Sequence, residues 1–332
     1  MTAPASGTME FPHRGAAMKV AAPVLSSLLY LSMFYVPIVG SLLNPFAPLP
    51  LVYNYFRYGQ VSAILAVGIS SALIGAAAGV PAGVFFALSY GLLALVMARG
   101  IERQMEISAV VASASAVAFG ATAIFLWFAL PGTAAEIYEL SLKMVNQFLS
   151  EAVETYKKAG IPAEQVEFIT QNADSISRWV IRLIPGTAAM GYLLMAAMNY
   201  VAYRGMQLRW TFLKPAGPAD LGLWSPPDKM VFAFIAGLGL ALVPDEAARA
   251  AGINVLIPVM AVYFIGGFCV IRFWFEKVRV PKFLRMAVYL LVLLHPFVIV
   301  GVAGTGLFDL WFDFRKIRRK DGMKEENNGT DT

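Results

Sequence analysis

Long apolar runs dominate this sequence and restrict what it can fold into. Eight such runs follow a polar N-terminal stretch. Only helices and closed barrels satisfy their own backbone hydrogen bonds in lipid, and barrel strands are shorter and alternate in polarity. We therefore predict an all-α fold, a polytopic integral membrane helix bundle with about eight transmembrane helices, seven to nine as the range. The runs are residues 20–43, 61–79, 82–98, 107–130, 183–203, 230–243, 253–275 and 283–310.

The composition supports the same class of protein. The chain is 58% hydrophobic and 14% charged, whereas soluble domains are about 45–50% apolar and about 25% charged. A soluble fold of 332 residues would expose too much of this apolar surface to water. The composition therefore excludes a soluble globular enzyme and a disordered chain.

The order of polar and apolar segments predicts five regions. A polar N-terminal tail (1–19) precedes the first half of the bundle (20–130), and an acidic amphipathic extramembrane segment (131–181) precedes the second half (182–310). A basic amphipathic C-terminal tail (311–332) closes the chain. Prolines interrupt the first half at 45–50 and are expected to forbid a regular helix there, so that this stretch dips into the membrane or lies on it.

The acidic segment has its own helical pattern. Apolar residues recur at three- and four-residue steps through 134–159, which predicts an amphipathic helix of about six turns. The residues Gly160 to Pro162 are expected to end it. A second, shorter amphipathic stretch (163–177) leads into the next apolar run.

Cations decide the expected orientation. The net charge is +5, and clusters of lysine and arginine near span ends usually face the cytoplasm, where they meet anionic headgroups and not nucleic acid. We expect both termini in the cytoplasm. Because eight simple crossings do not place every cationic loop on that side, the last run is expected to break near Gly301, Gly304 and Gly306.

Polar residues near or within the runs are the candidate ligand contacts. Arg57 stands beside Tyr53 and Asn54 just after the prolines, where a cation among aromatic rings can bind an anionic solute or headgroup, or can act as an interfacial anchor. Asn199 and His295 lie inside later runs. His295 precedes Pro296, so its imidazole can relay a proton, contact a ligand or bond a carbonyl that the proline frees.

The C-terminal end carries a second candidate surface. Asp309 and Asp313 are four residues apart, which places them on one face of a helix, and Trp311 adds apolar bulk. The arginines Arg315, Arg318 and Arg319 follow. We expect an amphipathic helix on an anionic lipid leaflet; the two acids can alternatively bind a cation or a protein partner.

The sequence carries no sign of catalysis. Phosphate-binding loops, zinc-protease helices and nucleophile elbows are all missing, and the chain has two histidines and one cysteine. We predict a protein that is not an enzyme, with no catalytic residues, no metal site and no cofactor.

With these residues in view, the chain resembles the YybS-like family of bacterial integral membrane proteins (domain of unknown function 2232). The prolines at 45–50 with Arg57-Tyr-Gly59 are similar to an early break in that family. Leu183-Ile-Pro185, Asn199, Arg204 and Trp224-Ser-Pro-Pro227 are similar to its centre. The most specific likeness is Gly306-Leu-Phe-Asp309-Leu-Trp-Phe-Asp313-Phe-Arg315. Two departures are the extra proline of Ser225-Pro-Pro227 and a longer acidic segment.

The resemblance implies a bacterial cytoplasmic (inner) membrane location and two hypotheses. The family is similar in helical organisation to the substrate-binding subunits of energy-coupling-factor vitamin transporters and to the rod-shape protein MreD. The first hypothesis is a solute-binding or transport component, with a small-molecule solute bound near Arg57. The alternative is a non-catalytic scaffold in cell-envelope or morphogenetic assembly, with a membrane protein partner. Both rest on fold-level analogy.

Overall fold

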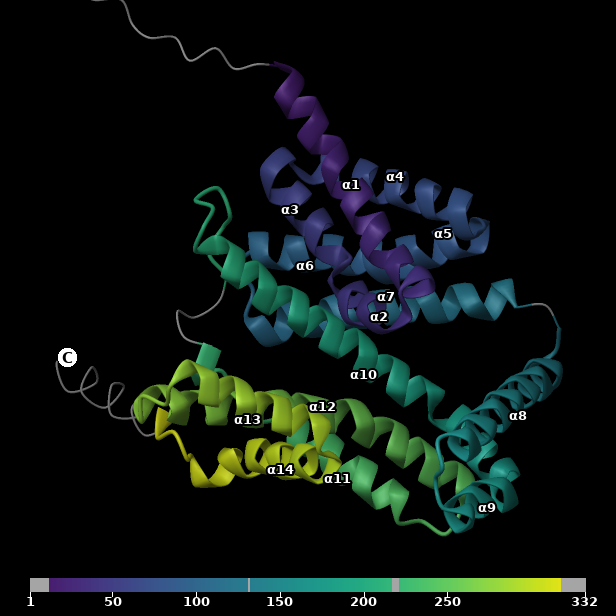
Figure 1. Ribbon diagram of the computed structural model, residues 1–332. Helices are drawn as coiled ribbons and strands as arrows, with labels where there is room; N and C mark the ends of the chain where they lie inside the picture. Colours follow the sequence, from purple (N-terminus) through teal and green to yellow (C-terminus); the bar gives the residue numbers. More distant parts are fainter. Residues whose placement is uncertain (1–11, 131, 217–220, 318–332) are drawn as a thin grey trace, which may run out of the picture. The chain divides into compact units, whose positions relative to one another are not determined.

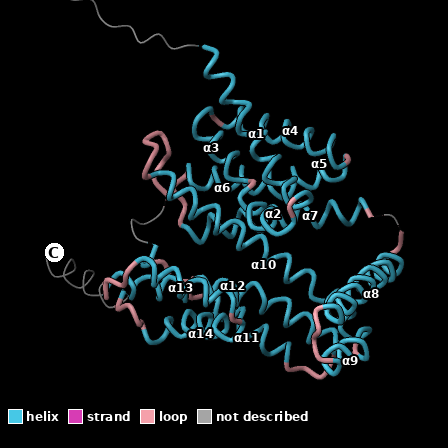
Figure 2. The backbone as a smooth tube through the Cα atoms, viewed as in Figure 1, coloured by secondary structure: helices cyan, strands magenta, loops and turns pink. Residues whose placement is uncertain are grey.

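The computed structural model describes residues 12–130, 132–216 and 221–317. These residues form helices joined by short loops, and no strand occurs among them (Figure 2). The prediction of an all-α membrane helix bundle is confirmed.

The helices follow one another with few long connections (Figure 1). Short 3₁₀ or π-helical stretches, labelled η, lie between some of them. The elements are α1 (Pro12–Tyr35), α2 (Pro37–Leu43), η1 (Asn44–Phe46), α3 (Pro48–Tyr58), α4 (Gln60–Ala78), α5 (Val80–Phe86), η2 (Ala87–Gly91), α6 (Leu92–Glu102), α7 (Ile107–Ala129), α8 (Ala134–Lys158), α9 (Ala163–Gln171), α10 (Ala173–Gln207), η3 (Leu221–Leu223), α11 (Met230–Ala241), α12 (Glu246–Lys277), α13 (Lys282–Leu294) and α14 (Pro296–Phe312).

Two compact units divide the chain. Unit 1 comprises Met1–Leu126 and Leu194–Gly217, and unit 2 comprises Trp127–Leu193 and Pro218–Thr332. The continuous helix α10 contributes residues to both. This differs from the predicted halves, 20–130 and 182–310, because the C-terminal part of α10 packs with the first helices of the chain.

Five helical segments of the described residues are long and apolar enough to cross a membrane. They are Gln60–Ala78, Val80–Glu102, Ile107–Ala129, Ala173–Gln207 and Glu246–Lys277, and a bent pair of helices at the C-terminal end makes up to six. Two shorter apolar helices, Lys19–Tyr35 and Met230–Ala241, account for the remaining predicted runs. The eight runs therefore all become apolar helices, but fewer than eight have full spanning length.

The first run is not one helix. The helix α1 ends at Tyr35, and α2 starts at Pro37 and packs back against α1. Proline removes a backbone donor and disfavours the helical conformation of the preceding residue; Val36 accordingly has φ −134° and ψ 75°. The return is close because Gly40 has no side chain: a Cβ there would overlap the backbone of Ser32.

The expectation that the prolines forbid a helix after residue 45 is wrong for most of this stretch. The helix α3 begins at Pro48 and includes Pro50, within its first turn. The first N–H groups of a helix have no partner within it, so proline is tolerated there and its fixed φ suits the helix. The break itself is confined to η1 and Ala47, where Ser26 donates a hydrogen bond to the Ala47 carbonyl (2.6 Å).

The acidic segment forms the helix α8 and the shorter helix α9, as the pattern predicts, and the two pack against each other as a hairpin. Thr133 and Glu136 build a reciprocal capping box at the start of α8, which satisfies backbone donors that a helix leaves free. Gly160, with φ +75°, lies just after its end. The shorter stretch beyond it is divided, since α9 ends at Gln171 and α10 begins at Ala173.

The last run breaks at His295 and not at the glycines. The helices α13 and α14 meet there at an angle of 104°. Pro296 begins α14, and His295 has an extended backbone (φ −112°, ψ 108°), because the residue before proline avoids helical geometry. Gly306 of α14 and Gly267 of α12 instead allow these two helices to cross closely. A Cβ at either glycine would overlap the backbone of the other helix.

Candidate functional site

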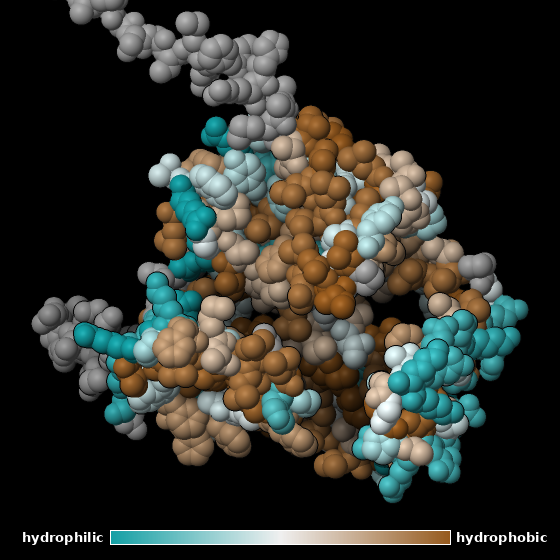
Figure 3. Space-filling model, viewed as in Figure 1, coloured by the Kyte–Doolittle hydropathy of each residue, from teal (hydrophilic) through white to brown (hydrophobic). Residues whose placement is uncertain are grey.

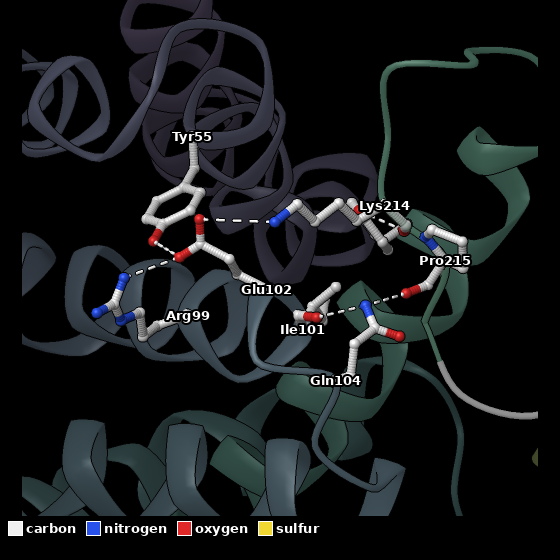
Figure 4. A network of polar contacts seen from close by, with 8 residues as sticks. Tyr55, Arg99, Ile101, Glu102, Gln104, Lys214 and Pro215 are labelled. Atoms are coloured by element: carbon white, nitrogen blue, oxygen red, sulfur yellow. Dashed lines mark hydrogen bonds and ion pairs between the residues drawn. The ribbon is translucent and has the colours of Figure 1, made fainter.

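A polar network joins α3, α6 and the loop after α10 at one end of unit 1 (Figure 4). The carboxylate of Glu102 accepts hydrogen bonds from the Tyr55 hydroxyl (2.7 Å) and the Arg99 guanidinium (2.9 Å). Lys214 Nζ lies 3.9 Å from the other carboxylate oxygen. Burial raises the pKa of Tyr55, and its bond to Glu102 raises it further. The hydroxyl therefore stays protonated and donates to the carboxylate.

The network lies where three chain segments end. Gly59 closes α3 with φ +89°, and α6 ends in the turn that contains Gln104. The loop after α10 is held by backbone acceptors: Tyr203 donates to the Lys214 carbonyl (2.9 Å) and Gln104 to the Pro215 carbonyl (2.9 Å). The loop side chains therefore have defined positions beside α3.

Arg57 lies at this same end, in a group that we call the cation–aromatic patch: Tyr53, Arg57, Trp210 and Phe212. The Arg57 guanidinium carbon lies 4.9 Å from the centroid of the Phe212 ring. The Tyr53 ring packs edge-on against the rings of Trp210 and Phe212, at 5.4 Å for each. Arg57 is exposed and has no hydrogen bond or ion pair with any described residue. Its charge is available to a molecule outside the chain.

The two asparagines predicted as ligand contacts lie inside the protein. Asn54 is fully buried and donates to the Lys19 carbonyl (3.4 Å). Asn199 is also fully buried and donates to the carbonyls of Pro45 (2.7 Å) and Met195 (2.8 Å). The Oδ1 atom of each has no hydrogen-bond partner among the described residues. Asn199 thus fastens α10 to the proline-rich break, and neither side chain faces the patch surface.

His295 belongs to unit 2 and is exposed at the junction of α13 and α14. Its backbone N–H donates to the Leu291 carbonyl, and its own carbonyl accepts from Val298 and Ile299. The residue thus ends one helix and begins the next. Arg57, Tyr53, Asn54 and Asn199 all lie in unit 1.

Two residues of the C-terminal motif lie inside unit 2, which corrects the prediction of lipid-facing or partner-facing side chains at Asp309 and Arg315. Both side chains are buried and form an ion pair at 2.6 Å. The helix α14 ends at Phe312, and Asp313 is left-handed with φ 43°, so Asp309 and Asp313 do not share a helix face. Trp311 is 61% exposed. Arg318 and Arg319 lie outside the described residues.

Several residues at the site have no distinctive sequence signal. Trp210 and Phe212 follow α10 in a loop of mixed polar and apolar residues, and Glu102 is one acid among cations at the end of an apolar run. The sequence predicts a cytoplasmic side for clustered lysine and arginine, but charge alone does not indicate which rings and acids Arg99 and Lys214 contact. No group of three or more His, Cys, Asp or Glu residues that could hold a metal ion occurs in the described ranges.

The comparisons with known proteins bear on the class of the chain. A family model described as "Predicted membrane protein (DUF2232)" matches residues 24–310. This is the family that the sequence motifs resemble, and the match confirms that resemblance. Neither the curated proteins nor the solved structures contain a match to the chain.

Proposed function

The chain belongs to the DUF2232 family of predicted membrane proteins, and we propose that it is a solute-binding or transport component that binds an anionic group at the cation–aromatic patch. Arg57 carries this proposal. Its guanidinium is held over Phe212 and no carboxylate among the described residues neutralises it. A guanidinium with free donors suits a carboxylate or phosphate, which it can bind in a bidentate manner.

The neighbouring network supports this choice of residue. Arg99 and Lys214 share the single carboxylate of Glu102, so their charges are partly compensated. Lys19 is a second cation that forms no ion pair with the described residues, and its Nζ lies 5.5 Å from the centroid of the Tyr58 ring. Two cations on aromatic rings at one end of unit 1 create a local positive potential that attracts anions.

In this proposal the protein is not an enzyme and needs no cofactor. It lies in a bacterial cytoplasmic membrane with both termini in the cytoplasm, and ATP-driven work would need separate subunits. The cationic end of unit 1 then faces the cytoplasm, as expected for clustered lysine and arginine. The basic C-terminal tail would contact anionic lipid.

Native mass spectrometry of the protein extracted from its own membranes tests this function. We expect a small anionic adduct that is lost in Arg57→Ala and weakened in Phe212→Leu. Arg103→Ala is the matched control, because it removes an exposed cation near the end of α6 that lies on no aromatic ring. Equal adducts in the wild type and in Arg57→Ala would refute the proposal.

Two sources of the anionic group are separated in a second step. Delipidated protein in a neutral detergent is titrated with inorganic phosphate, and protein in nanodiscs is titrated with phosphatidylglycerol. Loss of affinity in Arg57→Ala in the first experiment indicates a free anion. Loss of affinity only in the titration with phosphatidylglycerol indicates a lipid headgroup, and Arg57 is then an interfacial anchor.

A scaffold in envelope or morphogenetic assembly is the second candidate, and one observation favours it. The extramembrane hairpin of α8 and α9 exposes large apolar side chains: Leu140, Met144, Phe148 and Phe168 are 58–70% exposed. A stoichiometric membrane protein partner in the same mass spectra, without a small-molecule adduct, would support this function instead.

A further inference from the structure

The chain turns sharply between α13 and α14. The break at His295 changes its direction by 104°. The two helices have 13 and 17 residues, which makes them about 20 Å and about 26 Å long. Each is therefore shorter than the hydrocarbon core of a bilayer, which is about 30 Å thick. Such a pair either crosses the membrane with a bend or enters it and returns to the same face.

The helix α12 is the reference that distinguishes these two arrangements. It has 32 residues and is a candidate span, so its two ends mark the two faces of the membrane. The helix α11 runs antiparallel to it: a Cβ at Gly252, in the first half of α12, would overlap the backbone of Ala241 at the end of α11, whereas Pro226, before α11, lies against Gly266. The segment that precedes α11 is therefore on the side where α12 ends.

Both α13 and α14 pack against the second half of α12. In α13, the Tyr289 ring lies 4.9 Å from the Phe268 ring and 5.8 Å from the Phe275 ring, between centroids. In α14, a Cβ at Gly306 would overlap the backbone carbonyl of Tyr263. None of these contacts follows α12 back towards its first turn, as a complete crossing would require.

The end of α14 is attached on the same side. Arg315, which follows α14, donates hydrogen bonds to the carbonyls of Gly222 (2.5 Å) and Trp224 (2.8 Å). Gly222 belongs to η3, which packs against α12. In Figure 1 the end of α14 accordingly lies at the same end of unit 2 as the loop between α12 and α13.

We propose that α13 and α14 form a re-entrant hairpin. The chain enters the membrane after the α12–α13 loop, turns within the hydrocarbon with His295 at the tip, and returns to the face that it left. Among the described residues, α12 is then the last complete crossing. This inference does not depend on the function proposed for the cation–aromatic patch, which lies in unit 1.

The charges at this end of unit 2 fit the hairpin. Lys277, Arg279 and Lys282 flank or lie in the α12–α13 loop, Lys316 follows α14, and all four are exposed. A hairpin places these cations on one face, as is usual for lysine and arginine near spans, whereas a single crossing would separate Lys316 from the others. Figure 3 shows hydrophilic side chains at this end of unit 2 and mostly hydrophobic ones over α13 and α14.

Thiol labelling in membrane vesicles tests the direction of the return. The single-cysteine variants are Lys282→Cys, Lys316→Cys and, between α11 and α12, Pro244→Cys, all at exposed positions. The background carries Cys269→Ala, which removes the native cysteine. We expect a membrane-impermeant maleimide to label Lys282→Cys and Lys316→Cys in vesicles of one orientation, and Pro244→Cys only in vesicles of the other. Labelling of Lys316→Cys together with Pro244→Cys would show that the pair crosses the membrane.

Crosslinking within the folded chain gives a second measurement. In Leu223→Cys/Lys316→Cys a short bis-maleimide should join the two cysteines, because the end of α14 is bonded to the segment around Leu223. Pro244→Cys/Lys316→Cys is the matched control and should not crosslink, since a complete α12 of about 48 Å separates the two faces. A crosslink in the control pair, or none in Leu223→Cys/Lys316→Cys protein that elutes as the wild type in size-exclusion chromatography, would overturn the proposal.

Discussion

Arg315 donates hydrogen bonds from Nε (3.1 Å) and Nη2 (2.6 Å) to one carboxylate oxygen of Asp309, and both side chains are buried in unit 2. The remaining nitrogen, Nη1, donates to the carbonyls of Gly222 (2.5 Å) and Trp224 (2.8 Å). The pair therefore fastens the end of α14 to the segment that precedes α11. The most recognisable motif of the sequence thus holds unit 2 together.

Removing one partner of this pair should destabilise the protein strongly. Asp309→Asn leaves a buried guanidinium without its countercharge, and Arg315→Met leaves a buried carboxylate. Breaking such pairs costs about 3–5 kcal/mol, so we expect a clear fall in the thermal unfolding temperature in detergent. The exposed Arg249→Ala in the same unit is the control. Unfolding of Asp309→Asn at the wild-type temperature would contradict the structural role.

Sequence periodicity predicted the class of fold because burial in lipid leaves a simple signal, a long apolar run. It failed where local chemistry decides the outcome. Pro48 and Pro50 were read as helix breakers, but their position in the first turn makes them helix starters. Arg315 was read as a surface cation because its carbonyl acceptors lie 91 and 93 residues away, and no spacing rule reports such a contact.

Only the part of the candidate site that is close together in the sequence could be predicted. Arg57 and Tyr53 lie in the cation–aromatic patch, as their clustering in the sequence suggested. Their partners Trp210 and Phe212 come from a loop about 150 residues further on. Asn54 and Asn199 were read as ligand contacts because polar groups in apolar runs often mark sites, yet both bond backbone carbonyls of neighbouring segments.

Asn254 should be required for the local structure of α10. Its side chain donates to the Arg182 carbonyl (2.7 Å) and accepts from the Gly186 N–H (2.6 Å), two groups that a regular helix would join to each other. Pro185 lies between them and disturbs that turn. In Asn254→Leu both backbone groups lose this partner, at a cost of about 1–3 kcal/mol.

Hydrogen exchange measures this effect directly. We expect faster exchange of the Gly186 amide and its neighbours in Asn254→Leu than in the wild type. Thr187→Val is the matched control, because the exposed Thr187 hydroxyl bonds only carbonyls of its own helix. Unchanged protection at Gly186 would show that the α10 ladder does not depend on Asn254.

The crossing of α12 and α14 should tolerate no side chain at Gly306. A Cβ there would overlap the Tyr263 carbonyl and the Gly267 nitrogen, and backbone atoms of packed helices cannot move aside as a flexible side chain can. Overpacked cores lose about 1–3 kcal/mol, occasionally more. We expect Gly306→Ala to give little folded protein by size-exclusion chromatography. Gly304→Ala, with open space around its Cβ, should match the wild type; equal loss in both variants would argue against a steric cause.

Acid should weaken the start of α8. The Glu136 carboxylate accepts hydrogen bonds from the Thr133 N–H (2.6 Å) and hydroxyl (3.1 Å), and the backbone bond, followed by the hydroxyl bond, lowers the pKa of Glu136 below its usual value of 4.5. Because the pKa of Glu136 is lower in the folded state, the ionised carboxylate contributes to the stability of the helix start. This contribution is present above pH 4.5 and is lost as the pH falls through the lowered pKa. The first turn of α8 should therefore fray only at a pH below the usual pKa of 4.5.

A carboxyl NMR titration of glutamate-labelled protein in nanodiscs measures this pKa. Glu136→Gln identifies the Glu136 signal by its disappearance, and Glu154→Gln serves as the control that leaves it unchanged. In Thr133→Ala one of the two hydrogen bonds is lost, so the pKa of Glu136 should move back towards 4.5. A Glu136 carboxyl that titrates at its usual value in the wild type would mean that the capping box does not persist in solution.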